Sequence, residues 1–326
     1  MIVLTAADVE RLLPMGLAIE SCKQALAMHA AGETTVPLRT NIPVPAQQGA
    51  SALFMPASVP GLNTIGIKIV SHFPGNAARG LPVVPGQVLV FDGETGMLQA
   101  IMDGTSLTRI RTGAVQGAAT DLLARADAQV GALIGCGGQA GGQLAAMLEV
   151  RDLREVRVSA TSFAKAQAFS AEQAPLFSGC EIVPCRDAAE AVRGADVVTA
   201  VTSAKDAVFD GEAIAAGCHV NGIGSFTPEM AEIPDSLVAR ADRIFVDTQD
   251  CLAESGDIIG PIERGIIRAE DCLNLGDLVN GSVAGRADAQ QITLFNSVGS
   301  AVLDVVCADA VLRAAREQGI GTQVAI

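Results

Sequence analysis

The chain has 326 residues, 49% of them hydrophobic, and carries a formal net charge of −14. With about 150 residues per domain as a guide, this length predicts two domains, each large enough to bury a core. The negative charge argues against nucleic acid and anionic membranes as partners, because both bind basic surfaces. No run of about 18 apolar residues is present, so no segment is expected to span a membrane.

The beginning of the sequence and its cysteines indicate the compartment. MIVLTAADVERLLP has neither a basic start nor a continuous apolar stretch, so no secretory signal is expected and the expected location is cytoplasmic. The eight cysteines are scattered without a C-x-x-C pair, and we interpret them as reduced core residues. The three histidines are equally isolated, so no metal site is predicted.

The N-terminal part reads as two helices followed by short strands. Thr5 and Asp8 resemble a capping box that begins a short helix, Pro14 ends it, and a second helix stops at Gly32. This part is therefore predicted to be an antiparallel sheet behind two helices. The predicted strands are residues 39–44, 52–56, 64–71, 87–92 and 97–102, the last two joined by a hairpin turn.

A predicted helix over residues 105–126 leads into a strand, a glycine turn, a helix and a second strand within residues 129–161. The turn is a G-x-G-x-x-A arrangement, typical of a dinucleotide-binding fold. Gly135 permits the tight turn, and Gly137 lets the backbone approach a pyrophosphate bound at the helix start. Ala140 lets helix and strand pack closely. Between two strands, this turn favours a cofactor site over a purely structural turn.

Helix and strand patterns then alternate up to residue 247, which predicts a parallel, doubly wound sheet. Residues 250–288 read as irregular. A strand at 292–295 and a helix at 301–318 follow, and the helix is expected to return to the N-terminal sheet. The expected fold class is α/β, with a Rossmann-type domain at residues 127–297 and an α+β domain built from residues 1–126 and 298–326.

Lys68 lies in TIGIKIVS, on the strand face opposite Ile65, Ile67 and Ile69. Two interpretations stay open at this point. The ammonium is partly buried and needs an anionic or carbonyl partner, or it is exposed on the outer face of a sheet. Spacing alone slightly favours the exposed lysine.

Arg109 and Arg111 lie where a helix begins after the hairpin. Residues two apart do not share a helix face, so at most one of them points to a given ligand. The guanidinium fork suits a carboxylate, but a surface salt bridge is an equally good explanation for either arginine. The same two alternatives apply to Arg39.

The residues after the second strand of the glycine-turn unit bear on the choice of cofactor. A carboxylate there would bind the ribose 2′-hydroxyl of NAD. Asp and Glu are absent, and the run contains Thr161, Ser162 and Lys165 instead. Hydroxyls with a lysine suit a 2′-phosphate, so the cofactor is predicted to be NADP in preference to NAD.

Six motifs, in this order and spacing, resemble the ornithine cyclodeaminase/mu-crystallin family. They are MPA, IGIK ending at Lys68, FDGETGMLQAIMDG, LTRIRTGA, LIGCGGQA and IGSFTPEM. The match covers nearly the whole chain, and LTRIRTGA followed by GCGGQA is much more specific than the glycine turn alone.

The resemblance implies a homodimer, in which the N-terminal sheet and the C-terminal helix form the subunit contact and residues 1–126 and 298–326 bind substrate. Arg39 and Arg111 would hold the substrate carboxylate, while Lys68 approaches its carbonyl, imine or amine. Arg109 is then expected to form a surface salt bridge and to take no part in the site. The implied cofactor positions are Thr112, Gly137, Gly138, Gln139, Ala140, Val201, Thr202, Ser203, Ser297 and Gly299.

Departures from the family pattern indicate the reaction. Cyclodeaminases of this family, and the related archaeal alanine dehydrogenases, carry an acidic residue where this chain has Phe226. Cyclodeaminases also carry a glutamate in the segment where this chain has Leu53 and Phe54. Without these carboxylates, handling of the ornithine amine is disfavoured. The predicted function is NAD(P)H-dependent reduction of a cyclic or linear 2-imino acid, such as pyrroline-2-carboxylate.

Three alternatives stay open. One is a lyase of the cyclodeaminase or hydroxyproline dehydratase type. Another is an oxidoreductase like alanine dehydrogenase. The third is an NADPH-binding protein without turnover, as mu-crystallins can be. Retention of Arg39, Lys68 and Arg111 together favours catalysis over the third alternative.

Overall fold

The computed structural model describes residues 1–47 and 49–325. Residues 48 and 326, which fall in the expected substrate-binding domain, lie outside the described part. The chain forms two compact units, Met1–Arg111 with Ser300–Ile326 and Thr112–Gly299. The boundary falls inside helix α3 (Gly104–Leu123), earlier than the end of the predicted helix. None of the described helices is both long and apolar enough to cross a membrane.

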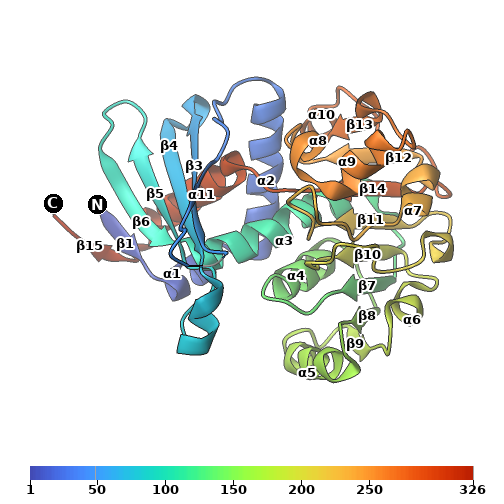
Figure 1. Ribbon diagram of the computed structural model, residues 1–326. Coiled ribbons are helices and arrows are strands. Elements are labelled where there is room, and N and C mark those ends of the chain that lie inside the picture. Colours follow the sequence, from blue (N-terminus) through green and yellow to red (C-terminus); the bar gives the residue numbers. More distant parts are fainter. Residues whose placement is uncertain (48, 326) are drawn as a thin grey trace. The chain divides into compact units, whose positions relative to one another are not determined.

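The first unit is a sheet with helices against one face (Figure 1). Its strand order is β15-β1-β6-β5-β4-β3-β2. The antiparallel sheet and the hairpin are confirmed, but the sequence missed β1 and its parallel pairing with β6. The strands are β1 (Ile2–Leu4), β2 (Thr40–Pro43), β3 (Ser51–Val59), β4 (Thr64–His72), β5 (Gly86–Asp92), β6 (Leu98–Asp103) and β15 (Thr322–Gln323).

Three helices of this unit were predicted from sequence, and each forms. Helix α1 (Ala6–Leu12) begins with the Thr5–Asp8 capping box, and α2 (Met15–Ala30) follows it. Helix α11 (Ala301–Gln318) packs against β3, β4 and β5. It comes close to β4 at Gly66, where a Cβ atom would lie 2.6 Å from a methyl group of Val305. Glycine at this position therefore allows the helix to lie directly on the strand that carries Lys68.

The second unit is a parallel sheet with the order β13-β12-β14-β11-β10-β7-β8-β9 (Figure 1). All its strand pairs are parallel, as predicted. Its strands are β7 (Val130–Ile134), β8 (Glu155–Ser159), β9 (Glu181–Pro184), β10 (Val197–Ala200), β11 (His219–Gly222), β12 (Arg243–Val246), β13 (Cys272–Asn274) and β14 (Thr293–Asn296).

Helices cover both faces of this sheet. Buried apolar side chains of α4 and α5 form one core, and those of α6, α7, α8 and α9 form part of the other. The prediction that 250–288 is irregular was wrong, because α8, α9, β13 and α10 lie there. The helices are α4 (Ala140–Val150), α5 (Phe163–Gln173), α6 (Ala188–Val192), α7 (Asp235–Arg240), α8 (Cys251–Glu254), α9 (Gly256–Glu263) and α10 (Leu275–Val279).

Candidate active site

The strand order of the parallel sheet reverses between β7 and β10. From β7 the chain moves outward to β8 and β9 on one side, and from β10 it moves to β11 on the other. Doubly wound sheets bind their ligands outside the carboxyl ends of the strands at such a point. Gly135 directly follows β7 and Val201 directly follows β10, so two sequence-predicted cofactor segments lie side by side at this point.

The glycine turn after β7 has the shape that a bound pyrophosphate requires. Gly135 adopts φ +110°, and a Cβ atom there would lie 2.5 Å from the carbonyl oxygen of Val201. At Gly137 and Gly138 nothing lies within 4 Å of the position that a Cβ would take. Helix α4 then begins without a side-chain cap from Gln139. The N–H of Ala140 donates to the Gly137 carbonyl oxygen at 3.0 Å, and the N–H groups that follow it in the first turn are available to an anion. These residues fit a dinucleotide.

Thr112 lies on α3 next to the residue at which α3 meets α4. The next residue on α3, Gly113, approaches that helix so closely that a Cβ atom would be 2.2 Å from the carbonyl oxygen of Gly142. The two glycines thus let the helices touch through their backbones. Thr112, the residue before Gly113 on α3, is thus adjacent in sequence to the point where α3 meets the first turn of α4.

The residues after β8 form a polar cluster without a carboxylate. Ser162 caps α5, and the Lys165 ammonium donates to the Thr161 hydroxyl at 3.2 Å. The sequence missed Arg186, which follows β9 at the same edge of the sheet and lies over the Phe163 ring at 5.1 Å. Its position after the next strand is the signal that could have found it, because parallel strands end at one edge.

Thr202, after β10, is held by a buried carboxylate that sequence reasoning did not find. The Glu232 carboxylate accepts hydrogen bonds from the backbone N–H of Thr202 at 2.7 Å and from its hydroxyl at 2.9 Å. Its other oxygen accepts from the backbone N–H groups of Ile223 at 3.0 Å and Gly224 at 2.5 Å. Glu232 therefore joins the ends of β10 and β11, where Val201 and Ser203 also lie.

Ser297 and Gly299, after β14, are held in the same way by Asp247. This residue follows β12 and is buried. Its carboxylate accepts from the Ser297 hydroxyl at 2.5 Å and from the Gly299 N–H at 2.8 Å. The structure thus brings the sequence-predicted cofactor residues that follow β7, β8, β10 and β14 to one edge of the parallel sheet, and adds carboxylates that fix two of these loops.

In the first unit, Lys68 and Arg111 both form ion pairs with a third buried carboxylate. Asp304 of α11 lies 2.7 Å from the Lys68 ammonium and accepts a hydrogen bond from the Arg111 Nε at 2.8 Å. The exposed fraction is 2% for Lys68, 6% for Arg111 and 0% for Asp304. The slight preference for an exposed Lys68 was therefore wrong. Lys68 faces α11, and Asp304 is the anionic partner that a buried lysine needs.

Burial alters the acidity of Lys68. Desolvation, and after it the charges of Arg111 and Arg39, lower its pKa to about 8, although Asp304 raises it in part. A lysine in this range can both donate and accept a proton near neutral pH. The influence of Arg39, which is half-buried just before β2, indicates that it lies near the same group. Arg109 pairs instead with Glu10 at the surface.

Two cysteine thiols lie close to the cluster of Lys68, Arg111 and Asp304. The Cys22 sulfur is 3.9 Å from that of Cys307 and donates to the Arg111 carbonyl oxygen at 3.6 Å. Burial raises the pKa of Cys22 well above its ordinary value, so it stays neutral. All eight cysteines are free thiols. In residues 1–47 and 49–325, no group of three or more His, Cys, Asp or Glu side chains could hold a metal ion.

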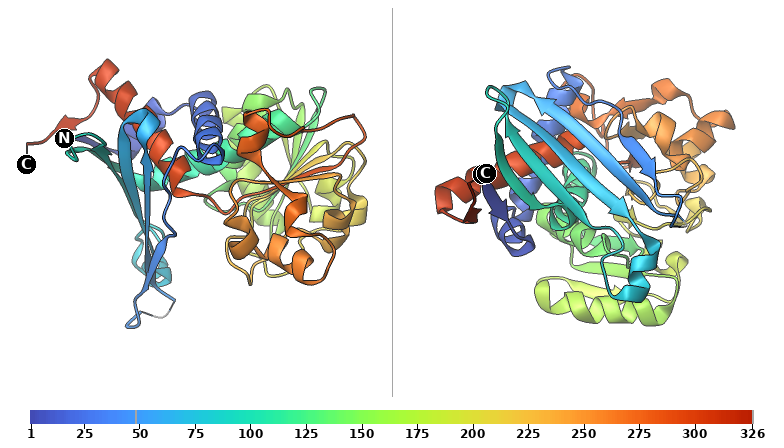
Figure 2. Two further views of the ribbon diagram at one scale, coloured as in Figure 1. Left: turned by 90° about the horizontal axis from the view of Figure 1, so that it is seen from above. Right: turned by 60° about the vertical axis from the view of Figure 1, so that its left-hand side comes forward.

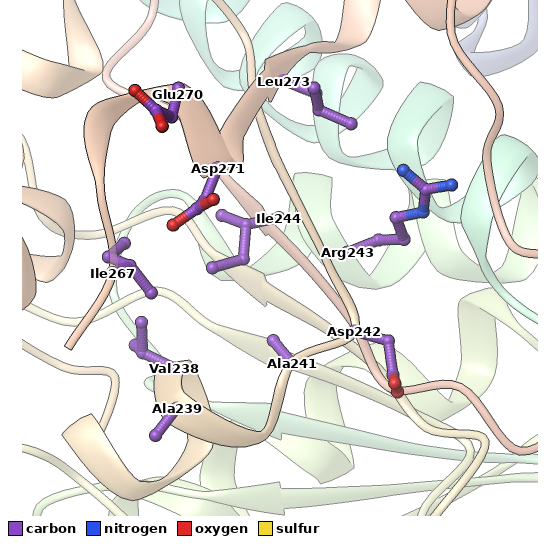
Figure 3. A pocket seen from close by; sticks show the side chains of 10 residues that line it. All are labelled: Val238, Ala239, Ala241, Asp242, Arg243, Ile244, Ile267, Glu270, Asp271 and Leu273. Carbon is purple, nitrogen blue, oxygen red and sulfur yellow. The ribbon is translucent and has the colours of Figure 1, made fainter.

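A pocket of about 330 Å³ lies at the opposite edge of the parallel sheet (Figure 3). It is lined by residues at the amino ends of β12 and β13, among them Asp242, Arg243 and Asp271. Because dinucleotides bind at the carboxyl ends of such strands, this pocket is not the cofactor site.

Comparisons with known proteins agree with this geometry. The model of the ornithine cyclodeaminase/mu-crystallin family matches residues 1–319. A Delta(1)-pyrroline-2-carboxylate reductase of Bacillus cereus is 37% identical over 326 residues, which cover 99% of each chain. The solved structure of the Thermococcus litoralis Delta(1)-pyrroline-2-carboxylate reductase, in complex with NADH and L-proline, is 36% identical. Its TM-score is 0.93, and the match covers 99% of this chain and 100% of that chain.

An archaeal alanine dehydrogenase dimer with bound NAD is also similar. It is 31% identical with a TM-score of 0.91, and the match covers 100% of this chain and 99% of that chain.

Proposed function

The chain belongs to the ornithine cyclodeaminase/mu-crystallin family, and we propose that within it the protein is an NAD(P)H-dependent reductase of 2-imino acids. The observation that carries this proposal is the buried pairing of Lys68 and Arg111 on Asp304. It places a lysine of lowered pKa beside an arginine that suits a carboxylate. The relatives at 36–37% identity, named as pyrroline-2-carboxylate reductases, support the same reaction.

The three cationic residues divide the work of binding and positioning. Arg111 and Arg39 bind the substrate carboxylate through charge-assisted hydrogen bonds, which fixes the imine group relative to Lys68. Lys68 orients the imine nitrogen and exchanges a proton with it. When bound, the reduced nicotinamide supplies the hydride that the imine carbon accepts.

We propose a cyclic 2-imino acid of the pyrroline-2-carboxylate type as substrate, with linear ketimines as a second group. The bound L-proline of the Thermococcus litoralis relative supports the cyclic form. In the reverse direction the same site would act as an amino-acid dehydrogenase. This direction is the one named for the archaeal alanine dehydrogenase that shares the fold.

The cofactor residues support NADPH in preference to NADH. The loop after β8 offers Thr161, Ser162 and Lys165, with Arg186 at the same edge, and no carboxylate lies at residues 159–165. Two cations and hydroxyls suit a 2′-phosphate, whereas a ribose 2′-hydroxyl is usually bound by Asp or Glu. The similar solved structures hold NADH and NAD, so a direct comparison of the two cofactors decides this point.

The lyase alternative has less support. Leu53 shares the face of the sheet that bears Met55 and Lys68, since β3 and β4 pair Met55 with Lys68. Phe226 is 55% exposed. At neither position does the chain offer the carboxylate that the cyclodeaminase resemblance calls for. A binding protein without turnover would not need a lysine of lowered pKa beside the arginine.

A second copy of the chain is the proposed partner. One face of the first unit's sheet carries no helix in the described residues, as the right-hand view of Figure 2 shows. Partly or largely exposed side chains make up this outer face. They include Ile42, Phe54, Ile65, Ile67, Ile69, Leu89, Phe91 and Ile101. Such a patch marks a protein interface, and the family resemblance implies a homodimer. We place this dimer in the cytoplasm, which eight free thiols support.

A substrate panel tests the proposed function. The purified protein is given NADPH or NADH with pyrroline-2-carboxylate, its six-membered homologue, and pyruvate with methylamine. We expect cofactor oxidation with at least one cyclic imino acid, and a lower KM for NADPH than for NADH. Release of ammonia from ornithine, with no oxidation of either cofactor by any imino acid, would instead establish the lyase. The chain has no Trp or Tyr, so NADPH fluorescence can be followed with little protein background.

A further inference from the structure

Asp304, in the first turn of α11, bridges two cations in a buried position. One oxygen faces the Lys68 ammonium at 2.7 Å, and the other accepts from the Arg111 Nε at 2.8 Å. Its neighbours on α11, Leu303 and Val305, are buried apolar residues. An ionised carboxylate in such a setting costs free energy unless its partners compensate for it.

Buried ion pairs often contribute little net stability, since apolar side chains of similar size can replace them. Stability alone therefore does not account for a carboxylate at this position. Lys68 and Arg111 carry two positive charges, and Asp304 supplies one negative charge. The three residues together carry one excess positive charge, which a substrate carboxylate would neutralise.

We propose that Asp304 is a positioning residue, which holds the Lys68 ammonium and the Arg111 guanidinium at fixed places and keeps Lys68 protonated for the reaction. This inference rests on the proposed function. Asp304 does so by engaging Arg111 through its Nε, which leaves the terminal nitrogens of the guanidinium as donors for the substrate carboxylate. Without this anchor, two neighbouring cations would repel each other and Lys68 would lose its proton at lower pH.

The groups that face Lys68 come from several elements. Arg111 of α3 and Arg39 lower its pKa, and desolvation lowers it most. Cys22 of α2 is neutral, because burial raises its thiol pKa well above the ordinary value. Among residues 1–47 and 49–325, Asp304 is the carboxylate that raises the Lys68 pKa. Removal of Asp304 is therefore expected to lower the pKa of Lys68.

Asp309 offers a matched control on the same helix. It is also a nearly buried aspartate of α11, but it accepts a hydrogen bond from the Thr64 hydroxyl at 2.8 Å and pairs with Arg313. Asp304→Asn and Asp309→Asn thus remove the same charge from one helix. Asp304→Ser serves as a second, smaller neutral variant should the asparagine disturb folding.

The test follows the ionisation of Lys68 directly, without relying on activity. The chain has four lysines, so lysine labelled with carbon-13 at Cε gives few NMR signals, and Lys68→Arg assigns one of them. We expect the Lys68 titration midpoint to fall by about one to three pH units in Asp304→Asn, as for loss of an opposite charge in contact. It should stay unchanged in Asp309→Asn.

Activity gives the second readout. In Asp304→Asn the alkaline decline of kcat/KM for imine reduction should move to lower pH by the same amount, and KM for the imino acid should rise. An unchanged Lys68 midpoint overturns the inference. Failure of both Asp304 variants to fold, with Asp309→Asn folded, overturns it as well by assigning Asp304 to stability. If the wild-type protein reduces no imino acid, the proposed function is wrong. The NMR titration would still show whether Asp304 raises the pKa of Lys68.

Discussion

Lys68 owes its chemical character to its burial rather than to the strand that carries it. From spacing the residue could face either way, because both faces of β4 carry apolar neighbours. The partner that decides the matter, Asp304, lies on a helix more than two hundred residues later in the chain. A carboxylate between Val302, Leu303 and Val305 is the signal that could have shown it, since a helix that is apolar all round is buried and an acidic residue within it needs a cation.

Replacement of Lys68 tests its role in the reaction. Lys68→Met keeps the length and apolar stem of the side chain but removes the ammonium. We expect kcat for imine reduction to fall by about 10²- to 10⁴-fold, the usual contribution of a positioned acid or base. Cofactor affinity, measured by NADPH fluorescence, should change less than about twofold. Full activity of a folded Lys68→Met protein would contradict the assigned role.

His219 provides a pH-dependent contribution to stability. It is fully buried, and burial lowers its pKa to about 3, so the folded state keeps it neutral. Its ring nitrogens contact the Thr293 hydroxyl at 2.9 Å and the Asn221 side-chain oxygen at 3.0 Å. The ordinary pKa is 6.5, so the stabilising effect is complete above that pH. It is lost as pH falls towards 3, because only the unfolded state takes up the proton.

The predicted slope can be measured by urea unfolding between pH 7 and pH 4. His219 alone should reduce the free energy of unfolding by about 1.4 kcal/mol for each pH unit below 6.5. His219→Gln should lower stability at pH 7 but lose less of it on acidification. Equal slopes in the two proteins would show that His219 takes up its proton in the folded state as well.

At the scale of elements, local signals predicted most of the fold. The capping box, the hairpin turn and the strand–turn–helix–strand unit each form from residues close in sequence, and each occurs as expected. The strands β1 and β15 were missed because both are very short and gain their pairing from other parts of the sheet. The helices within residues 250–288 are also short, so their periodicity is weak.

The glycine turn allows a prediction that separates folding from cofactor binding. Gly137→Ala places a methyl group where nothing lies within 4 Å, so stability should stay nearly unchanged. The same methyl group should obstruct a pyrophosphate and weaken NADPH binding by about tenfold or more, a loss of about 1.4 kcal/mol. Fluorescence titration and thermal unfolding measure the two effects.

Gly135→Ala is the contrasting variant of this experiment. Its methyl group would clash with the Val201 carbonyl oxygen, and alanine disfavours φ +110°. We expect it to reduce stability by about 1–3 kcal/mol as well as cofactor affinity. If Gly137→Ala binds NADPH as tightly as the wild-type protein, the turn does not hold the pyrophosphate.

At the scale of the whole molecule, the outer face of the first unit's sheet predicts association. Leu89→Asp introduces a charge at the centre of this face, opposite Ile67 and Ile101 on the flanking strands. We expect the wild-type protein to sediment at twice 33.3 kDa and the variant to sediment as a monomer. Leu176→Asp, at an exposed leucine of the second unit, should leave the mass unchanged. A dimeric Leu89→Asp protein would show that another surface forms the contact.

In the proposed reaction, the protein transfers hydride to the imine carbon of a 2-imino acid. The most direct measurement uses reduced cofactor deuterated at both C4 positions of the nicotinamide, with pyrroline-2-carboxylate as substrate and mass spectrometry of the product. We expect proline that carries one deuterium at its α-carbon, formed in equal amount to oxidised cofactor. Proline without deuterium, or no proline while the cofactor remains reduced, would contradict it.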